Sequence, residues 1–133
     1  MARVVFDTSA LIAIDRRLVP IENVVIAGED YFLPEIVVAE YLTGIEHSRN
    51  AQQKSRKLQT LRALEGVCTR VDFGRIQAAR YAKLAAHAKK TGRPRSEFDL
   101  AIAACALSLD AQIKTSDRAA KFEELPGITV SYF

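Results

Sequence analysis

Long apolar runs, abundant cysteine and a strong charge imbalance are all missing from this chain of 133 residues. No stretch approaches the roughly 18 consecutive apolar residues of a membrane span, so we expect no membrane segment. A carboxylate at Asp7 lies where a secretory signal needs its apolar core, and this indicates a cytoplasmic protein. The only cysteines, Cys68 and Cys105, lack the C-x-x-C spacing of a zinc site or redox motif. Their apolar neighbours favour buried, reduced thiols.

The bulk composition is that of one compact globular domain spanning residues 1–133. About half of the residues are apolar (49%), which suffices for a hydrophobic core at this length. The formal net charge is +3, from 19 basic and 16 acidic residues, and this small excess does not define a partner. The basic residues are concentrated in two segments, 49–62 and 87–95.

Strand and helix signals alternate along the chain. We expect strands at 3–6, 30–33, 67–71, 112–115 and 128–132, and helices at 10–16, 34–47, 50–65, 97–109 and 117–124, with a further helix that Asp72 caps and that runs to about residue 90. The 97–109 helix is apolar nearly all round and is predicted to be central. This alternation predicts an α/β fold with a parallel sheet covered on both faces. Ligands of such sheets bind beyond the carboxyl ends of the strands.

Two aspartates lie just beyond predicted strands. Asp7 ends the first strand, where it could simply cap the following helix. Thr8 and Ser9 offer alternative caps and leave Asp7 free for other chemistry. Asp117 follows the 112–115 strand, where turn formation is the competing explanation.

Two further carboxylates lie on predicted helices. Glu40 has no cation at the neighbouring helical positions, although an ordinary half-exposed glutamate is the competing interpretation. Asp99 opens the most apolar helix of the chain, where an isolated carboxylate needs a partner or a metal ion. A capping arrangement with Ser96 is the alternative explanation for Asp99.

The four carboxylates are more informative together than singly. Asp7, Glu40, Asp99 and Asp117 all fall where an α/β sheet could bring them to one edge. Carboxylate oxygens without histidine or cysteine suit Mg²⁺ or Mn²⁺ rather than zinc. Without a cation, clustered carboxylates repel one another and raise their own pKa values. The pattern therefore predicts a metal-dependent site.

In order along the chain, the motifs 5–10 (VFDTSA), Pro34 with Glu40, 99–104 (DLAIAA) and 115–117 (TSD) with Phe122 resemble the PIN-domain ribonucleases. Within that family they resemble the VapC-type toxins of toxin–antitoxin pairs. The resemblance covers essentially the whole chain. Ser116 stands where many relatives carry asparagine.

The resemblance implies a PIN-like, twisted, five-stranded parallel sheet flanked by helices and a Mg²⁺- or Mn²⁺-dependent endoribonuclease. It implies that Asp7, Glu40, Asp99 and Asp117 surround one or two ions. Thr8, Ser9, Thr115 and Ser116 are expected to support the site by positioning a carboxylate, a water molecule or a phosphate oxygen. It also implies a homodimer that a small cognate antitoxin protein inhibits.

An RNA substrate needs cations on the approach to this acidic site. Lys89, Lys90, Arg93 and Arg95 precede the Asp99 helix and are candidates for binding phosphate groups. A solvated, basic helix end is the competing interpretation of this segment. A non-catalytic RNA- or protein-binding domain on the same fold also remains open. A phosphatase is disfavoured, because Ser9 occupies the place of the second aspartate that haloacid-dehalogenase phosphatases require.

Overall fold

A computed structural model describes residues 1–133 and contains a single five-stranded sheet. The strands are β1 (Ala2–Phe6), β2 (Glu29–Pro34), β3 (Thr69–Val71), β4 (Gln112–Thr115) and β5 (Val130–Tyr132). They lie in the order β3-β2-β1-β4-β5, and every neighbouring pair is parallel. The predicted α/β class and parallel sheet are confirmed.

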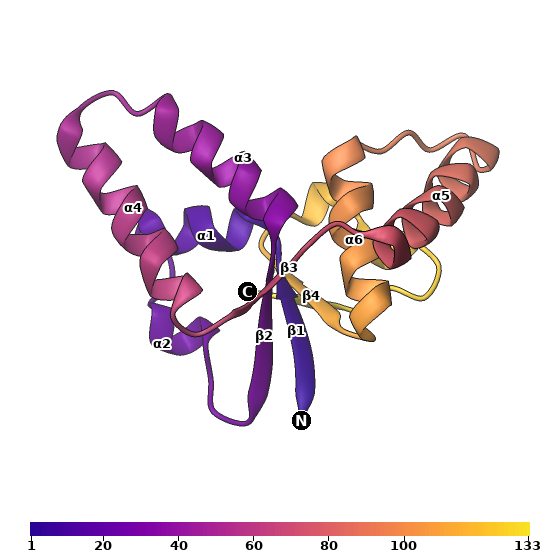
Figure 1. Cartoon of the computed structure of the whole chain (residues 1–133), viewed down its shortest axis with the longest axis horizontal. Helices are drawn as coiled ribbons and strands as arrows, with labels where there is room; N and C mark the ends of the chain where they lie inside the picture. The colour runs from indigo at the N-terminus through magenta and orange to yellow at the C-terminus, as the bar shows by residue number, and fades with distance from the viewer.

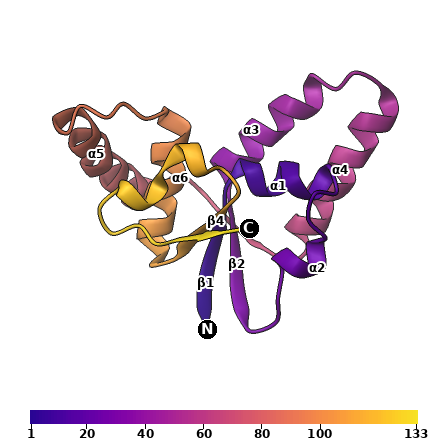
Figure 2. The same ribbon diagram turned by 180° about the vertical axis from the view of Figure 1, so that it is seen from behind.

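The helices lie on both sides of this sheet (Figure 1). On one side are α1 (Thr8–Asp15), α2 (Ile21–Val24), α3 (Glu35–Glu46) and α4 (Ala51–Glu65). On the other are α5 (Arg75–Lys90) and α6 (Glu97–Leu109). The reverse view shows the same separation, with α1 beside α3 and α4, and α5 beside α6 (Figure 2). None of the helices is both long enough and apolar enough to cross a membrane.

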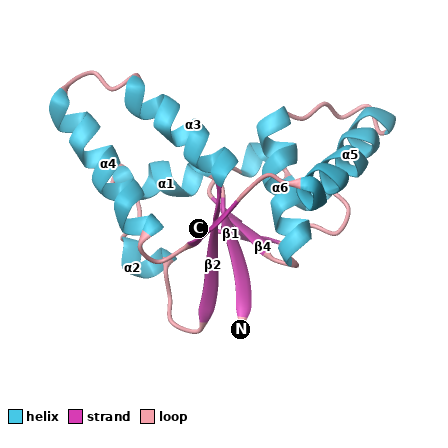
Figure 3. Ribbon diagram, viewed as in Figure 1, coloured by secondary structure: helices cyan, strands magenta, loops and turns pink.

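Helices flank the central strands on both sides (Figure 3). The hydrophobic core combines buried residues of these strands and of the helices packed on them. Val4, Val5 and Phe6 of β1 are fully buried, as expected for a parallel strand covered on both faces. Residues 100–106 of α6 are all buried, which confirms that the most apolar helix is central. The core therefore holds α6, and Asp99 at its first turn, firmly against the sheet.

The strand order places a topological switch point beside β1. The chain runs outward from β1 to β2 and β3, and then returns to the other side of β1 to form β4 and β5. Phe6 of β1 pairs with Lys114 of β4, so both strands end at the same level. Asp7 and the residues after Thr115 therefore emerge side by side, where open parallel sheets bind their ligands.

Apart from shifts of one or two residues at element ends, as in β3, β5 and α1, the structure differs from the predicted elements at three places. The helix expected at 117–124 is two short 3₁₀ helices, Arg118–Ala120 and Phe122–Glu124, because Lys121 between them adopts a left-handed backbone conformation (φ 50°). Asp72 does not cap α5, which begins at Arg75 after Gly74. The single-turn helix α2 was not predicted; at four residues it is too short to show a helical period.

Candidate active site

Asp7 is a buried carboxylate at the carboxyl end of β1, with 4% of its surface exposed. It caps α1 by accepting the Ala10 N–H at 3.2 Å, and it also accepts the hydroxyls of Ser9 (2.7 Å) and Thr115 (2.6 Å). Burial raises its pKa to about 6. The three hydrogen bonds oppose this rise, whereas the charge of Asp117 adds to it. Both predicted roles, cap and functional carboxylate, are therefore compatible with its position.

Thr115 is the fully buried link between the ends of β1 and β4. Its hydroxyl donates to Asp7 and accepts the Asp117 N–H at 2.9 Å. The Ser9 hydroxyl lies 3.0 Å from that of Thr115 and accepts the N–H of the exposed Ser116 at 3.0 Å. Two side-chain hydroxyls thus join the two strand ends and orient Asp7.

Asp117 and Asp99 approach from two other segments. Asp117 is exposed after β4, and its carboxylate accepts the Ala120 N–H at 3.2 Å. Asp99 is half-buried in the first turn of α6, where its N–H donates to Ser96 Oγ at 3.0 Å. Burial raises the pKa of Asp99, its Ser96 contact lowers it, and the charge of Asp117 raises it again. Asp117 is therefore an electrostatic neighbour of both Asp7 and Asp99.

Glu40 lies on α3 and is joined to the region of Asp7 by a hydrogen bond from Thr8, the first residue of α1. Its carboxylate is half-buried on α3 and accepts the Thr8 hydroxyl at 2.6 Å. Thr8 directly follows Asp7 and begins α1. Hydrogen bonds thus join Asp7 and Asp117 through Ser9 and Thr115, and they join Glu40 to Thr8. Asp99 is linked to the first set only through the charge of Asp117.

The donor chemistry of the site fits a hard divalent cation, because its candidate ligands are all carboxylates. Burial and mutual repulsion leave Asp7 and Asp99 with raised pKa values, and a bound cation would offset both effects. However, no three acidic, histidine or cysteine side chains are grouped closely enough to hold one ion as they stand. Coordination by three carboxylates would therefore require their side chains to rotate.

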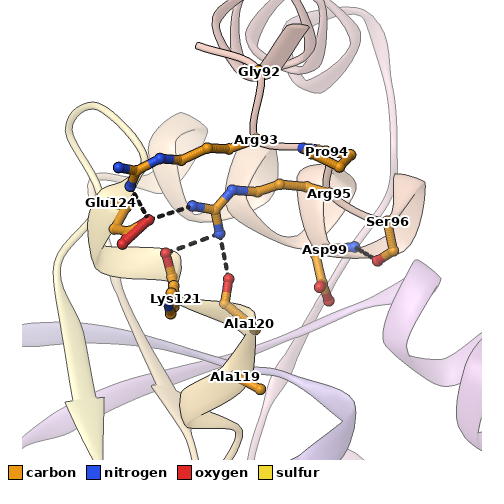
Figure 4. A pocket seen from close by; sticks show the side chains of 10 residues that line it. All are labelled: Gly92, Arg93, Pro94, Arg95, Ser96, Asp99, Ala119, Ala120, Lys121 and Glu124. Atoms are coloured by element: carbon orange, nitrogen blue, oxygen red, sulfur yellow. Dashed lines mark hydrogen bonds and ion pairs between the residues drawn. The ribbon is translucent and has the colours of Figure 1, made fainter.

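A cavity of about 530 Å³ lies beside Asp99, between the start of α6 and residues 119–124 (Figure 4). The Asp99 carboxylate faces this cavity, and Arg93 and Arg95 extend across its edge to Glu124. Lys121 also lines it. The sequence did not single out Lys121 or Glu124, because their proximity to Asp99 depends on tertiary packing.

The four cations predicted to bind RNA differ in their surroundings. Lys89 and Lys90 are exposed at the end of α5, and the Arg93 side chain is 66% exposed although it pairs with Glu124 at 2.7 Å. The Arg95 side chain is only 8% exposed and donates to the backbone carbonyls of Ala120 and Lys121. Arg95 is thus enclosed by the protein, whereas the other three side chains are exposed.

Comparisons with known proteins bear on the fold and the family of the chain. A search of curated proteins found no match. Among solved structures, a chain of VapBC2 from Rickettsia felis, in a crystal structure with a promoter DNA fragment, has a TM-score of 0.85 at 17% identity over 98% of both chains. A chain of DNA-bound VapBC from Salmonella typhimurium has a TM-score of 0.83 at 20% identity, covering 99% of this chain and 98% of that one.

A third structure is more similar in sequence. VapBC-5 from Mycobacterium tuberculosis, a member of the VapBC family of toxin–antitoxin systems, matches at 25% identity with a TM-score of 0.77, over 100% of this chain and 98% of the other. A family model described as the PIN domain matches residues 4–127. PIN domains are nucleases that generally use divalent metal ions. The chain therefore belongs to the PIN-domain family.

Proposed function

We propose that this chain is a Mg²⁺- or Mn²⁺-dependent endoribonuclease that acts as the toxin of a toxin–antitoxin pair. The observation that carries the proposal is that Asp7, Asp99 and Asp117 lie near the switch point of a PIN-family sheet, where the charge of Asp117 acts on both of the other two carboxyls. The carboxylates come from the end of β1, the start of α6 and the turn after β4, so three separate segments of the chain supply them. This arrangement suits hydrolysis of a phosphodiester bond.

The protein's own residues have distinct roles in this hydrolysis. Asp7, Asp99 and Asp117 would hold the cation, with Ser9 and Thr115 keeping Asp7 in place. Glu40, which Thr8 orients, would complete the coordination or align the attacking water. A bound divalent ion lowers the pKa of its water and neutralises charge that develops on the phosphoryl group.

RNA would approach over the basic side of the cavity. Lys89, Lys90, Arg93 and Lys121 are exposed and can contact phosphate groups without breaking a buried network. We expect Arg93→Glu to weaken RNA binding and to lower the slope of log affinity against log salt by about 1 for the lost phosphate contact. Unchanged binding and salt slope would remove Arg93 from the RNA-binding surface.

The proposed partners are a small antitoxin and a second copy of the chain. Matching folds occur in the VapBC complexes named above, and VapBC-5 belongs to a toxin–antitoxin family. Light scattering of the purified chain tests the homodimer. A mass near 14.7 kDa would identify a monomer, and twice that mass would identify the dimer.

The function is tested by cleavage of labelled tRNA, rRNA and mRNA with and without Mg²⁺ or Mn²⁺. Asp99→Asn, purified in parallel, controls for contaminating nuclease, and folding of both proteins is checked by circular dichroism. We expect cleavage that needs metal and disappears in the variant. Metal-independent cleavage, or equal cleavage by Asp99→Asn, would contradict the proposal.

A non-catalytic binding domain is distinguished by calorimetric titration with Mn²⁺. The enzyme requires Mn²⁺ binding that Asp99→Asn weakens. RNA binding without any Mn²⁺ binding would favour the non-catalytic alternative. The observation that favours this alternative is that no three potential ligands are already grouped around one position.

A further inference from the structure

Arg95 is the most enclosed cation beside the candidate active site. Its side chain is 8% exposed, whereas that of the neighbouring Arg93 is 66% exposed. The guanidinium donates to the carbonyls of Ala120 and Lys121, the latter at 2.9 Å, and lies 3.4 Å from a Glu124 carboxylate oxygen (Figure 4). A buried charge persists only where such contacts compensate its lost hydration, so these contacts fix the guanidinium in one position.

These contacts connect the two segments that carry Asp99 and Asp117. On one side, Ala120 donates its N–H to the Asp117 carboxylate, and its carbonyl accepts from Arg95. On the other side, the next residue after Arg95 is Ser96, which caps α6 by accepting the Asp99 N–H. A continuous path of hydrogen bonds and one peptide link therefore runs from Asp117 through Arg95 to Asp99.

Asp99 and Asp117 carry like charges, so a contact that holds their two segments together acts against their repulsion. The charge of Asp117 raises the pKa of Asp99, and the charge of Arg95 lowers it. Asp117 lies on an exposed turn after β4, and the 3₁₀ helix that follows it has only three residues. Without Arg95, this turn would lose its direct hydrogen bonds to the start of α6.

We propose that Arg95 is a positioning residue that holds the Asp117 turn against the N-terminus of α6 and so sets the separation of Asp99 and Asp117 for cation binding. The proposal rests on the proposed function for the identity of the cation site. Glu124 supports Arg95 from the far side and shares its carboxylate with Arg93. A lysine cannot replace the planar fork that reaches two carbonyls and a carboxylate together.

Whether removal of Arg95 raises or lowers the Mn²⁺ affinity distinguishes a positioning role from a purely electrostatic one. Removing a positive charge near a cation site should strengthen cation binding if charge alone matters. Loss of positioning should weaken it instead. Arg93→Met is the matched control, because Arg93 also pairs with Glu124 but contacts neither turn carbonyl.

The experiment measures Mn²⁺ affinity by calorimetry, without RNA, for the wild type, Arg95→Met, Arg95→Lys and Arg93→Met, each shown to be folded by urea titration. We expect Arg95→Met to weaken Mn²⁺ binding about 10- to 100-fold, the usual effect of removing a residue that orients metal ligands. Arg95→Lys should fall between Arg95→Met and the wild type, and Arg93→Met should bind as tightly as the wild type or tighter. Unchanged or tighter binding by Arg95→Met, or equal weakening by Arg93→Met, would overturn the proposal.

A metal-free measurement keeps the test separate from the proposed function. Amide hydrogen exchange of Ala120 reports on its bond to Asp117, and it should accelerate in Arg95→Met and in Arg95→Lys but not in Arg93→Met. If the wild type bound no Mn²⁺, the proposed function would fail, and the exchange of Ala120 would still decide whether Arg95 holds the turn. Unchanged exchange in both Arg95 variants would overturn the positioning role. If Arg95→Met did not fold, Arg95→Lys would carry both measurements.

Discussion

At the scale of single residues, the site places a carboxylate where its charge is unfavourable in the metal-free protein. Asp7 is 4% exposed and has a pKa of about 6, against 3.8 for an unperturbed aspartate. Its three hydrogen bonds only partly offset burial. Because the unfolded chain releases this proton at lower pH, the folded state holds an extra proton between about pH 4 and pH 6. The free energy of unfolding should therefore fall as the pH rises through this window.

We predict that Asp7→Asn stabilises the metal-free protein near neutral pH. A rise of about two pKa units corresponds to about 3 kcal/mol, which sets the upper bound of the gain. The gain should vanish below about pH 4, where the carboxyl of the wild type is already protonated. Urea unfolding of the wild type and Asp7→Asn, in EDTA at several pH values, measures this gain in the free energy of unfolding. A stability difference that does not change with pH would mean that burial does not perturb this carboxyl.

The hydroxyl of Thr115 gives a second prediction at this scale. Thr115→Val keeps the shape of the side chain but removes the hydrogen bond to Asp7 Oδ2 and the acceptor of the Asp117 N–H, while Asp7 Oδ1 keeps its bonds from Ser9 and Ala10. We expect a loss of about 1–3 kcal/mol of stability at neutral pH. Thr115→Ser keeps the hydroxyl and should lose only about 1 kcal/mol for one buried methyl group. Chemical denaturation measures the stability of Thr115→Val and Thr115→Ser, with Thr43→Val at an exposed position as the control. If Thr115→Val were as stable as Thr115→Ser, the Thr115 hydroxyl would not support the strand ends.

Some residues of the site could be predicted from the sequence, and others could not. Asp7, Asp99 and Asp117 were identifiable because each lies at a strand end or helix start that local patterns reveal. The competing capping explanations for Asp7 and Asp99 also describe real contacts, since Asp7 caps α1 and Ser96 caps α6. The buried position of Arg95 was not predictable, because its partner Glu124 lies 29 residues away along the chain.

At the scale of elements, local patterns predicted the strands and long helices but not their irregular ends. Apolar strands such as β1 and the apolar helix α6 have strong, uninterrupted signals, and the structure confirms them. The expected helix at 117–124 breaks at Lys121, whose left-handed conformation no residue type there announces. This break matters for the site, because it exposes the carbonyls of Ala120 and Lys121 that Arg95 contacts.

Helices α1, α3 and α4 meet at a polar cluster in which Asp15 and Tyr41 are buried and the Arg56 side chain is 41% exposed. The Tyr41 hydroxyl donates to Asp15 at 2.8 Å, and a nitrogen of Arg56 lies 3.7 Å from the other Asp15 oxygen, which accepts no hydrogen bond. Burial, and then the contact with Asp15, raise the pKa of Tyr41, so it remains a donor over the physiological range. Tyr41 adjoins Glu40, so this cluster fixes the part of α3 that serves the site.

We predict that Tyr41→Phe destabilises the protein by about 1–3 kcal/mol, because Asp15 keeps its buried charge and loses its hydrogen bond. Tyr132→Phe is the matched control, since it removes a hydroxyl whose partner, Glu123, is exposed. That change should cost at most about 0.5 kcal/mol. Urea unfolding measures both; similar losses in the two variants would mean that the Asp15 contact gives α1 and α3 no particular support.

At the scale of the whole molecule, cation binding would join elements that the chain connects only through long segments. Asp7, Asp99 and Asp117 belong to the end of β1, the start of α6 and the turn after β4. A ligand that contacts all three binds only the folded state, so it must raise the free energy of unfolding. The ion also competes with the proton that Asp7 holds below about pH 6. The stabilisation that a bound metal ion gives therefore depends on pH.

We predict that Mn²⁺ raises the melting temperature near neutral pH and that this rise shrinks as the pH falls below about 6. At a free concentration a hundred times the Kd, one bound ion adds about 2.7 kcal/mol. Thermal unfolding with Mn²⁺ and with EDTA measures the difference. Asp99→Asn should lose most of it. Asp110→Asn, at an exposed left-handed position that asparagine tolerates, should retain it.

The pair of variants distinguishes a specific site from diffuse attraction of a divalent ion to acidic residues. Each variant removes one negative charge from α6 or its C-cap, so general electrostatics predicts equal losses. A site at the switch point predicts a loss only in Asp99→Asn, because Asp110 lies at the opposite end of that helix. Equal Mn²⁺ effects in the two variants, or a rise that persists unchanged at low pH, would place the ion elsewhere and remove the structural basis for metal-dependent hydrolysis at these aspartates.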